Sequence, residues 1–162
     1  MRWHLSELSV WGVLLVACAG CSSANPDLVS VAGRVTFNGG NMPARGTVYF
    51  LPMSGSVADG QPKRPALAHF REDVMFRATT WRPGDGLRPG SYRVIIECWK
   101  EAPSMSSRGI SYVDLKYLDP EQSEISLEVR SEDGNLKLAW DVTGPSEPVD
   151  LGRTGISEME MN

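Results

Sequence analysis

The side chain best suited to catalysis in this sequence is His69, since the only other histidine, His4, lies close to the N-terminus. An imidazole can serve as general base for a hydroxyl nucleophile, and such sites are defined by geometry rather than by position in the chain. His69 alternates with apolar residues in Ala-Leu-Ala-His-Phe, which is typical of a strand histidine that faces solvent or the edge of a core. No Gly-x-Ser-x-Gly motif accompanies it. We therefore expect no catalytic residue, and a small hydrolase built around His69 is the less favoured alternative.

The carboxylates follow no metal-binding pattern. They are scattered at residues 72–73, Asp114, Asp119, Glu121 and residues 132–133. None has the D-x-[DN]-x-[DN]-G order of a calcium loop. Surface turns explain them better, so we expect neither a metal nor another cofactor.

The three cysteines fall into two groups. Cys98 lies in a predicted strand, where a free cysteine usually packs as a small hydrophobic residue. We favour that role over a nucleophile because no histidine or basic residue is adjacent in sequence. Cys18 and Cys21 form a C-x-x-C pair, but this pair follows directly on an apolar leader and lacks partner ligands. A redox or metal site is therefore not expected there.

The leader has the features of a secretory signal. Residues 10–17 form an apolar segment behind Arg2 and the amino terminus, too short to span a bilayer. Leu15-Val-Ala-Cys18 resembles the signal of bacterial lipoproteins, in which a cysteine after a small residue is acylated and becomes the new N-terminus. Cys21 also follows small residues, but a cysteine stands where an aliphatic residue is usual. The resemblance implies acylation of one of the two, Cys18 preferred, and an ordinary cleaved signal is the alternative.

Acylation would place the protein in the cell envelope. Each buried methylene contributes about 0.8 kcal/mol, so a diacylglyceryl group with an amide-linked acyl chain anchors stably. The residue after the acylated cysteine, Ala19 or Ser22, permits sorting to the outer membrane by the same resemblance. The expected partners are the membrane and an unknown envelope protein or polysaccharide. The net charge of -4 argues against nucleic acid.

Tryptophans are the best candidates for ligand contacts. Trp81 falls in a predicted loop, and Trp99 lies on the strand face opposite the main apolar stripe. A partly exposed tryptophan can mark a protein or carbohydrate contact, whereas a sandwich can also bury both faces near a strand end. Both interpretations of Trp99 stay open. Trp140 shares a face with Leu136 and Leu138, so we expect it in the core.

Period-two patterning predicts the strands that carry these residues. The central one spans residues 87–99 and starts at a Pro-Gly turn. The others are predicted at 28–37, 46–53, 66–70, 74–80, 124–130 and 135–142, with 66–70 and 74–80 forming a hairpin. Residues 110–118 are ambiguous. The pattern predicts an all-β protein with one small β-sandwich of about seven strands, preceded by a signal-peptide helix.

We expect four parts along the chain. Residues 1–17 form the lipoprotein signal peptide, 18–28 a tether, 29–143 the β-sandwich and 144–162 a flexible acidic tail.

Three segments carry a resemblance to a known family. Val31-Ala-Gly-Arg-Val-Thr-Phe-Asn-Gly-Gly, Gly46-Thr-Val-Tyr-Phe-Leu-Pro and Gly86-Leu-Arg-Pro-Gly-Ser-Tyr-Arg-Val resemble the carboxypeptidase regulatory-like domain. Over residues 29–143 the resemblance implies a transthyretin-like or Ig-like sandwich, common in small lipoproteins of planctomycete-type bacteria. The family usually has Asp-x-Asp-Gly-x-Phe where this chain has Arg71-Glu-Asp-Val-Met-Phe. Because the glycine is replaced by Val74, the register of the hairpin stays open.

The resemblance does not imply an activity. Transthyretin-related hydrolases rely on several histidines and a C-terminal Tyr-Arg-Gly-Ser-type ending, and this chain has neither. We therefore expect a non-enzymatic, membrane-anchored lipoprotein whose sandwich is an interaction or structural module. The alternative is a module that binds a carbohydrate or envelope polymer through Trp81 or Trp99.

Overall fold

The computed structural model describes residues 28–53, 57–58, 61–62, 64–71 and 73–152, and these form an all-β fold. The expected signal-peptide helix, Cys18 and Cys21 lie outside these residues. The strands are β1 (Ser30–Phe37), β2 (Gly46–Pro52), β3 (Val57–Ala58), β4 (Gln61–Pro62), β5 (Ala66–Phe70), β6 (Met75–Arg77), β7 (Gly90–Glu101), β8 (Ile110–Ser111), β9 (Ser126–Val129), β10 (Asn135–Val142) and β11 (Val149–Asp150). A single 3₁₀ turn, η1 (Leu115–Tyr117), follows β8.

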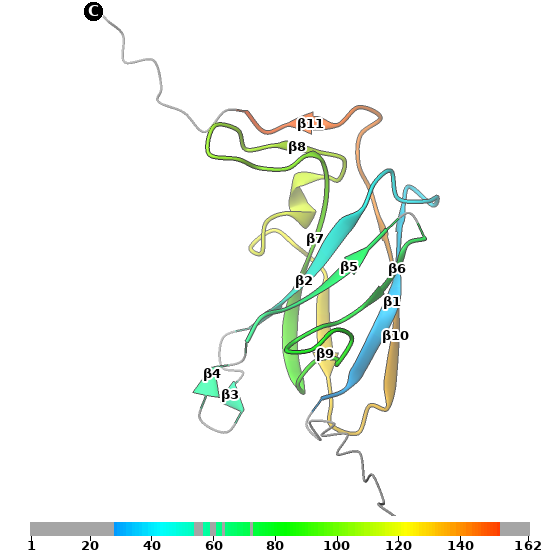
Figure 1. Cartoon of the computed structure of the whole chain (residues 1–162), viewed down its shortest axis with the longest axis vertical. Helices are drawn as coiled ribbons and strands as arrows, with labels where there is room; N and C mark the ends of the chain where they lie inside the picture. The colour runs from blue at the N-terminus through cyan, green and yellow to red at the C-terminus, as the bar shows by residue number, and fades with distance from the viewer. Residues whose placement is uncertain (1–27, 54–56, 59–60, 63, 72, 153–162) are drawn as a thin grey trace, which may run out of the picture.

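Two sheets make up the sandwich (Figure 1). The smaller has the order β10-β1-β6, and the larger has the order β11-β8-β7-β2-β5 with β9 also paired to β7. The predicted all-β sandwich is confirmed. The sheets hold three and six strands, more than the expected seven or so, because the two-residue strands β8 and β11 extend the larger sheet.

The predicted alternation of the central strand is confirmed in β7. Tyr92, Val94, Ile96 and Cys98 are all buried on its inner face. Ile95, on the other face, is also buried, so that face is only partly open to solvent. Burying one aliphatic or aromatic side chain contributes about 1.5–3 kcal/mol, so this face is a major source of stability.

Aromatic rings join the two sheets. Phe76 on β6 stacks on Trp140 of β10 with ring centroids 5.5 Å apart and an interplanar angle of 5°. Phe50 on β2 lies 6.3 Å from both rings. Trp140 is packed against the core as expected, although it is only partly buried. Gly33, on the central strand of the smaller sheet, makes room for the Phe76 ring.

The predicted hairpin of residues 66–80 is wrong. β5 pairs with β2 in the larger sheet, whereas β6 pairs with β1 in the smaller one. Only one bridge, between Leu67 and Thr79, connects the two segments as antiparallel neighbours. The chain therefore arches from one sheet to the other. This arch contains Val74, which has a φ of +60° at the position of the family's glycine.

The predicted flexible tail from residue 144 is also wrong for its first part. Val149 and Asp150 form β11, which pairs antiparallel with β8. The Gly152 carbonyl accepts a hydrogen bond of 2.8 Å from the Arg108 amide. The folded part therefore extends past residue 143, and residues 153–162 lie outside the described residues.

The strand directions define two ends of the sandwich (Figure 1). At one end β1 begins and Val29 pairs with Leu87, just before β7 starts. At the other end β1 has finished at Phe37, and β2 begins at Gly46 opposite Cys98 near the end of β7. The segment that follows the expected tether therefore enters at the end opposite to the start of β2.

Candidate functional site

A row of polar side chains crosses the outer face of the larger sheet at this far end. Thr47 on β2 is directly opposite His69 on β5 and Glu97 on β7. Its neighbour Val48 points into the core, so the period of two places Thr47 outside. Side chains directly opposite in neighbouring strands are in contact range. The Thr47 hydroxyl lies 3.1 Å from Nδ1 of the exposed His69.

Glu97 interacts with two aromatic side chains of the same face, Trp99 and Tyr49. The indole Nε1 of Trp99 donates a hydrogen bond of 3.0 Å to Oε2 of Glu97. Burial raises the pKa of Tyr49, and the negative charge of the nearby Glu97 raises it further. The hydrogen bond from Trp99 helps to orient the Glu97 carboxylate.

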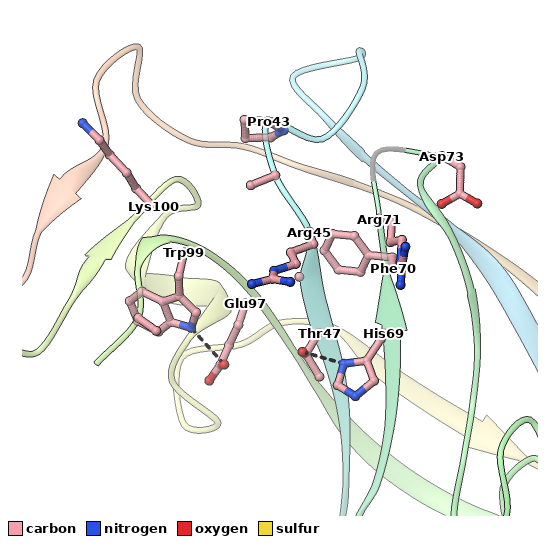
Figure 2. A pocket seen from close by; sticks show the side chains of 13 residues that line it. Pro43, Arg45, Thr47, His69, Phe70, Arg71, Asp73, Glu97, Trp99 and Lys100 are labelled. Carbon is pink, nitrogen blue, oxygen red and sulfur yellow. Dashed lines mark hydrogen bonds between the residues drawn. The ribbon is translucent and has the colours of Figure 1, made fainter. Parts of the chain in front are cut away.

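These residues line one open hollow of about 1190 Å³ (Figure 2). Its main polar and aromatic lining residues are Arg45, Thr47, His69, Arg71, Glu97 and Trp99. Figure 2 shows the Arg45 side chain between Trp99 and Phe70, with Thr47 and His69 beside each other. We call this hollow the Trp99 groove.

The Trp99 groove has charges of both signs. Arg45, Arg71 and Lys100 supply positive charge, whereas Glu97 and Asp73 supply negative charge. Arg45, Arg71, Lys100 and Asp73 are all exposed. Among the described residues, no carboxylate forms an ion pair with any of the three basic side chains.

The polar row does not have the order of a catalytic triad. In a triad the base lies between nucleophile and acid, and the acid orients the base. Here Thr47 lies between His69 and Glu97, so the carboxylate is beside the hydroxyl and not beside the imidazole. Within the described part of the chain, no carboxylate hydrogen-bonds to His69. The sequence expectation of a solvent-facing histidine is confirmed, because His69 is exposed.

The two candidate tryptophans lie at opposite ends of the sandwich. Trp99 is partly exposed near the end of β7, whereas Trp81 lies in the loop before β7 begins. The β7 strand covers about 30 Å between Gly90 and Trp99. Trp81 is 45% exposed, and the guanidinium carbon of Arg88 lies 5.4 Å from its ring centroid. The two rings therefore belong to different surfaces.

Cys98 is confirmed as a packing residue. Its side chain is fully buried, and Sγ donates a weak hydrogen bond of 3.5 Å to the Ala44 carbonyl. Burial raises the pKa of its thiol to about 11. Because the thiolate is the nucleophilic form, this cysteine is unreactive in the folded protein.

Several carboxylates serve turns, as the sequence indicated. Asp119 accepts hydrogen bonds from the amide of Glu121 and the side chain of Gln122. Asp133 accepts one of 2.7 Å from the Arg130 amide. Within the described residues, no group of three or more metal-ligating side chains is assembled.

Three groove residues carried no signal of their own in the sequence. Thr47, Arg45 and Arg71 are ordinary strand or loop residues until β2 is placed between β5 and β7. Alternation predicted that His69 faces solvent or the edge of the core and that Trp99 lies opposite the apolar stripe of its strand, and the structure places both on the outer face. Only the register between the strands brings them to one place.

The leader cysteines remain a prediction, since they lie outside the described residues. No helix among the residues that the structure describes is long and apolar enough to cross a membrane.

Comparison of the chain with protein-family models, with curated proteins and with solved structures finds no match.

Proposed function

We propose that this protein is a non-catalytic binding module, anchored in the cell envelope by an N-terminal lipid, that takes its ligand in the Trp99 groove. The observation that carries this proposal is the groove itself. It combines a partly exposed Trp99 with hydrogen-bonding side chains and three basic side chains on one sheet face. Ligand sites typically pair an apolar or aromatic surface with a few fixed polar groups.

The position of the groove suits an anchored protein. The expected lipid is attached before residue 28, and β1 begins at one end of the sandwich. The Trp99 groove lies at the opposite end, where β2 starts and β7 finishes (Figure 1). A short tether would therefore hold the end of the sandwich that carries Trp81 towards the membrane. The groove would then face away from the membrane. This favours Trp99 over Trp81 as the ligand contact.

The anchor is tested by intact mass and detergent partitioning of the protein from its native membrane, together with Cys18→Ala and Cys21→Ala variants. We expect one substitution alone, at Cys18, to abolish the lipid mass and membrane retention. A soluble protein without lipid would contradict the anchor and leave the binding proposal to stand for a secreted module.

Binding is tested by co-sedimentation of the full chain, in detergent, with isolated insoluble envelope polysaccharide. Trp99→Ala is the test variant, and Trp81→Ala is the matched control at the other end. We expect Trp99→Ala to weaken retention about tenfold, because a buried aromatic contact contributes roughly 1–3 kcal/mol. Trp81→Ala should bind as the unaltered protein does. Equal retention of both variants would contradict a role for the groove.

A hydrolase is the second candidate, and the Thr47–His69 contact is the observation that favours it. His69 would take the proton of the Thr47 hydroxyl as its oxygen attacks the ester carbonyl, and would return that proton to the departing alcohol as the ester C–O bond breaks. Water would then hydrolyse the acyl-threonine and release the acid. Among the described residues no carboxylate orients His69, and this argues against the role. Turnover of chromogenic esters that disappears in both Thr47→Val and His69→Ala would support the hydrolase and contradict the non-catalytic proposal.

A further inference from the structure

We infer that the ligand of the Trp99 groove is an acidic polysaccharide, a chain of sugars that carry carboxylate groups. This inference rests on the proposed binding function and adds the chemical class of the ligand. It follows from the charges around the groove, from the partners of its carboxylates and from the position of Trp99.

The groove has more positive than negative side chains, whereas the whole chain is acidic. The whole protein has a net charge of -4, yet Arg45, Arg71 and Lys100 surround one hollow. Arg45 lies just before β2, and Arg71 lies just after β5. Because these strands are antiparallel and Gly46 pairs with Phe70, the two arginines lie at the same end of the sheet. Guanidinium groups bind carboxylates through paired hydrogen bonds. A carboxylate bound between neighbouring basic side chains would also reduce the repulsion between their positive charges.

The acidic residues of the groove do not neutralise these cations. Glu97 accepts a hydrogen bond from the Trp99 indole. Asp73 lies on the far side of Arg71 from Trp99 (Figure 2). Neither forms an ion pair with Arg45, Arg71 or Lys100 within the described residues. Three basic side chains thus stand against two carboxylates around the groove, and this excess of positive charge favours an anion.

The remaining groups suit a sugar chain. Trp99 offers a partly exposed aromatic surface for the apolar face of a sugar ring. Thr47 and His69 supply hydrogen-bonding groups for ring hydroxyls, and the Nε2 atom of His69 is the ring nitrogen not used by Thr47. An open hollow that follows the sheet surface can accept a long polymer without enclosing its ends. A nucleic acid would instead require a broadly basic face.

The experiment compares soluble polygalacturonate with its fully methyl-esterified form, using the full chain in detergent. The two polymers have the same backbone and differ in carboxylate charge. Binding is measured by calorimetry in low salt and in 0.5 M salt for the unaltered protein, the double variant Arg45→Gln/Arg71→Gln, Trp99→Ala and the control Arg34→Gln. Arg34 is an exposed arginine on β1, in the other sheet.

We expect the acid form to bind at least about tenfold more tightly than the ester, because the two arginines meet carboxylates only in the acid. The double variant should lose about tenfold in affinity, and Arg34→Gln should change it less than about twofold. High salt should weaken binding of the acid form, because salt screens exposed charges.

Each contrary result has a separate meaning. Equal binding of ester and acid, lost in Trp99→Ala, would overturn the acidic class and leave the proposed binding function intact. Polyglutamate that binds as tightly as polygalacturonate would show recognition of charge alone and overturn the choice of a sugar. If neither polymer binds while Trp99→Ala still reduces retention on envelope material, the inference fails and the proposed function stands. If that retention is also unchanged, both fail.

Discussion

The indole nitrogen of Trp99 lies 3.0 Å from a carboxylate oxygen of Glu97, two residues earlier on the same outer face of β7. This hydrogen bond fixes the tryptophan at the rim of the groove instead of leaving it free to rotate. The pair therefore supports the binding proposal, in which Trp99 is a ligand contact.

The first prediction concerns Val74, whose φ of +60° is strained for a β-branched residue. At ordinary positions alanine is more stable than glycine by about 0.5–1 kcal/mol, whereas left-handed backbone costs a residue with a Cβ about 1–2 kcal/mol. We expect Val74→Gly to be more stable than Val74→Ala by about 1 kcal/mol. Urea unfolding followed by tryptophan fluorescence measures the difference.

At Val74 we thus expect glycine to be more stable than alanine, the opposite of the usual order. The control is Val129, a buried residue within β9. There Val129→Ala should be more stable than Val129→Gly. If alanine were favoured over glycine at both positions, the backbone strain assigned to Val74 would be wrong.

The second prediction concerns Gly33, which lies beneath an aromatic ring. A Cβ added to Gly33 would meet Phe76 Cζ at 2.6 Å and the Leu138 carbonyl oxygen at 2.5 Å. Gly33→Ala should therefore lower the free energy of unfolding by about 1–3 kcal/mol, as overpacking does elsewhere. Gly134→Ala is the matched control, because nothing lies within 4 Å of the added atom. A similar small change in both variants, measured by urea unfolding, would contradict the packing described for Phe76.

The third prediction concerns Asp85, which organises the loop that carries Trp81. Its carboxylate accepts hydrogen bonds from the amides of Thr80 (2.7 Å), Trp81 (3.1 Å) and Arg82 (2.8 Å). Burial alone would raise the pKa of Asp85, but these hydrogen bonds outweigh it and the pKa lies below its ordinary value. We expect Asp85→Ala to lower the free energy of unfolding by about 1 kcal/mol at neutral pH. The loss should be no larger because the carboxylate is partly solvated.

The pH dependence of this cost has a definite sign. A lowered pKa in the folded state stabilises the protein above the unfolded value of about 4, and this contribution disappears as the pH falls through the lower folded value. The difference between the unaltered protein and Asp85→Ala should therefore shrink below about pH 4. The exposed Glu124→Ala serves as control. A difference that stays constant from pH 7 to pH 2 would show that the carboxylate charge is not responsible.

The fourth prediction concerns the Cys98 thiol, which is fully buried and has a pKa of about 11. Alkylation at pH 8 should leave the peptide of residues 94–100 unlabelled in the folded protein and label it fully in 6 M guanidinium chloride. Mass spectrometry of the digest measures this. Rapid labelling without denaturant would contradict the burial of Cys98 and return it to the list of candidate nucleophiles.

Local patterning predicted the strands well because most of them bury one face. The bounds of β5 and β10 agree with the residues expected from alternation, and those of β1, β2, β6 and β9 differ only at their ends. The arch between β5 and β6 was missed, since a turn between two strands does not say whether they share a sheet. The parallel pairing of β1 with β10 was also beyond sequence reasoning, because it joins residues about a hundred positions apart.

Only some residues of the candidate site could be predicted, because single-strand patterns do not show which strands are neighbours. Trp99 and His69 were singled out by residue type and by the face on which alternation placed them. Arg45, Arg71 and Thr47 gained their significance from strand order, which single-strand patterns do not contain. Trp81 was also proposed as a ligand contact because it is a tryptophan, but the fold places it at the end of the sandwich opposite to the groove.

The most direct test of the account is hydroxyl-radical footprinting of the full chain with and without soluble fragments of the envelope polysaccharide. Trp99 and Trp81 are both exposed enough to be oxidised in the free protein. If the Trp99 groove is the binding site, the polysaccharide should protect Trp99 and His69 and leave the oxidation of Trp81 unchanged. Protection of Trp81 alone, or of neither tryptophan while the polysaccharide is bound, would contradict it.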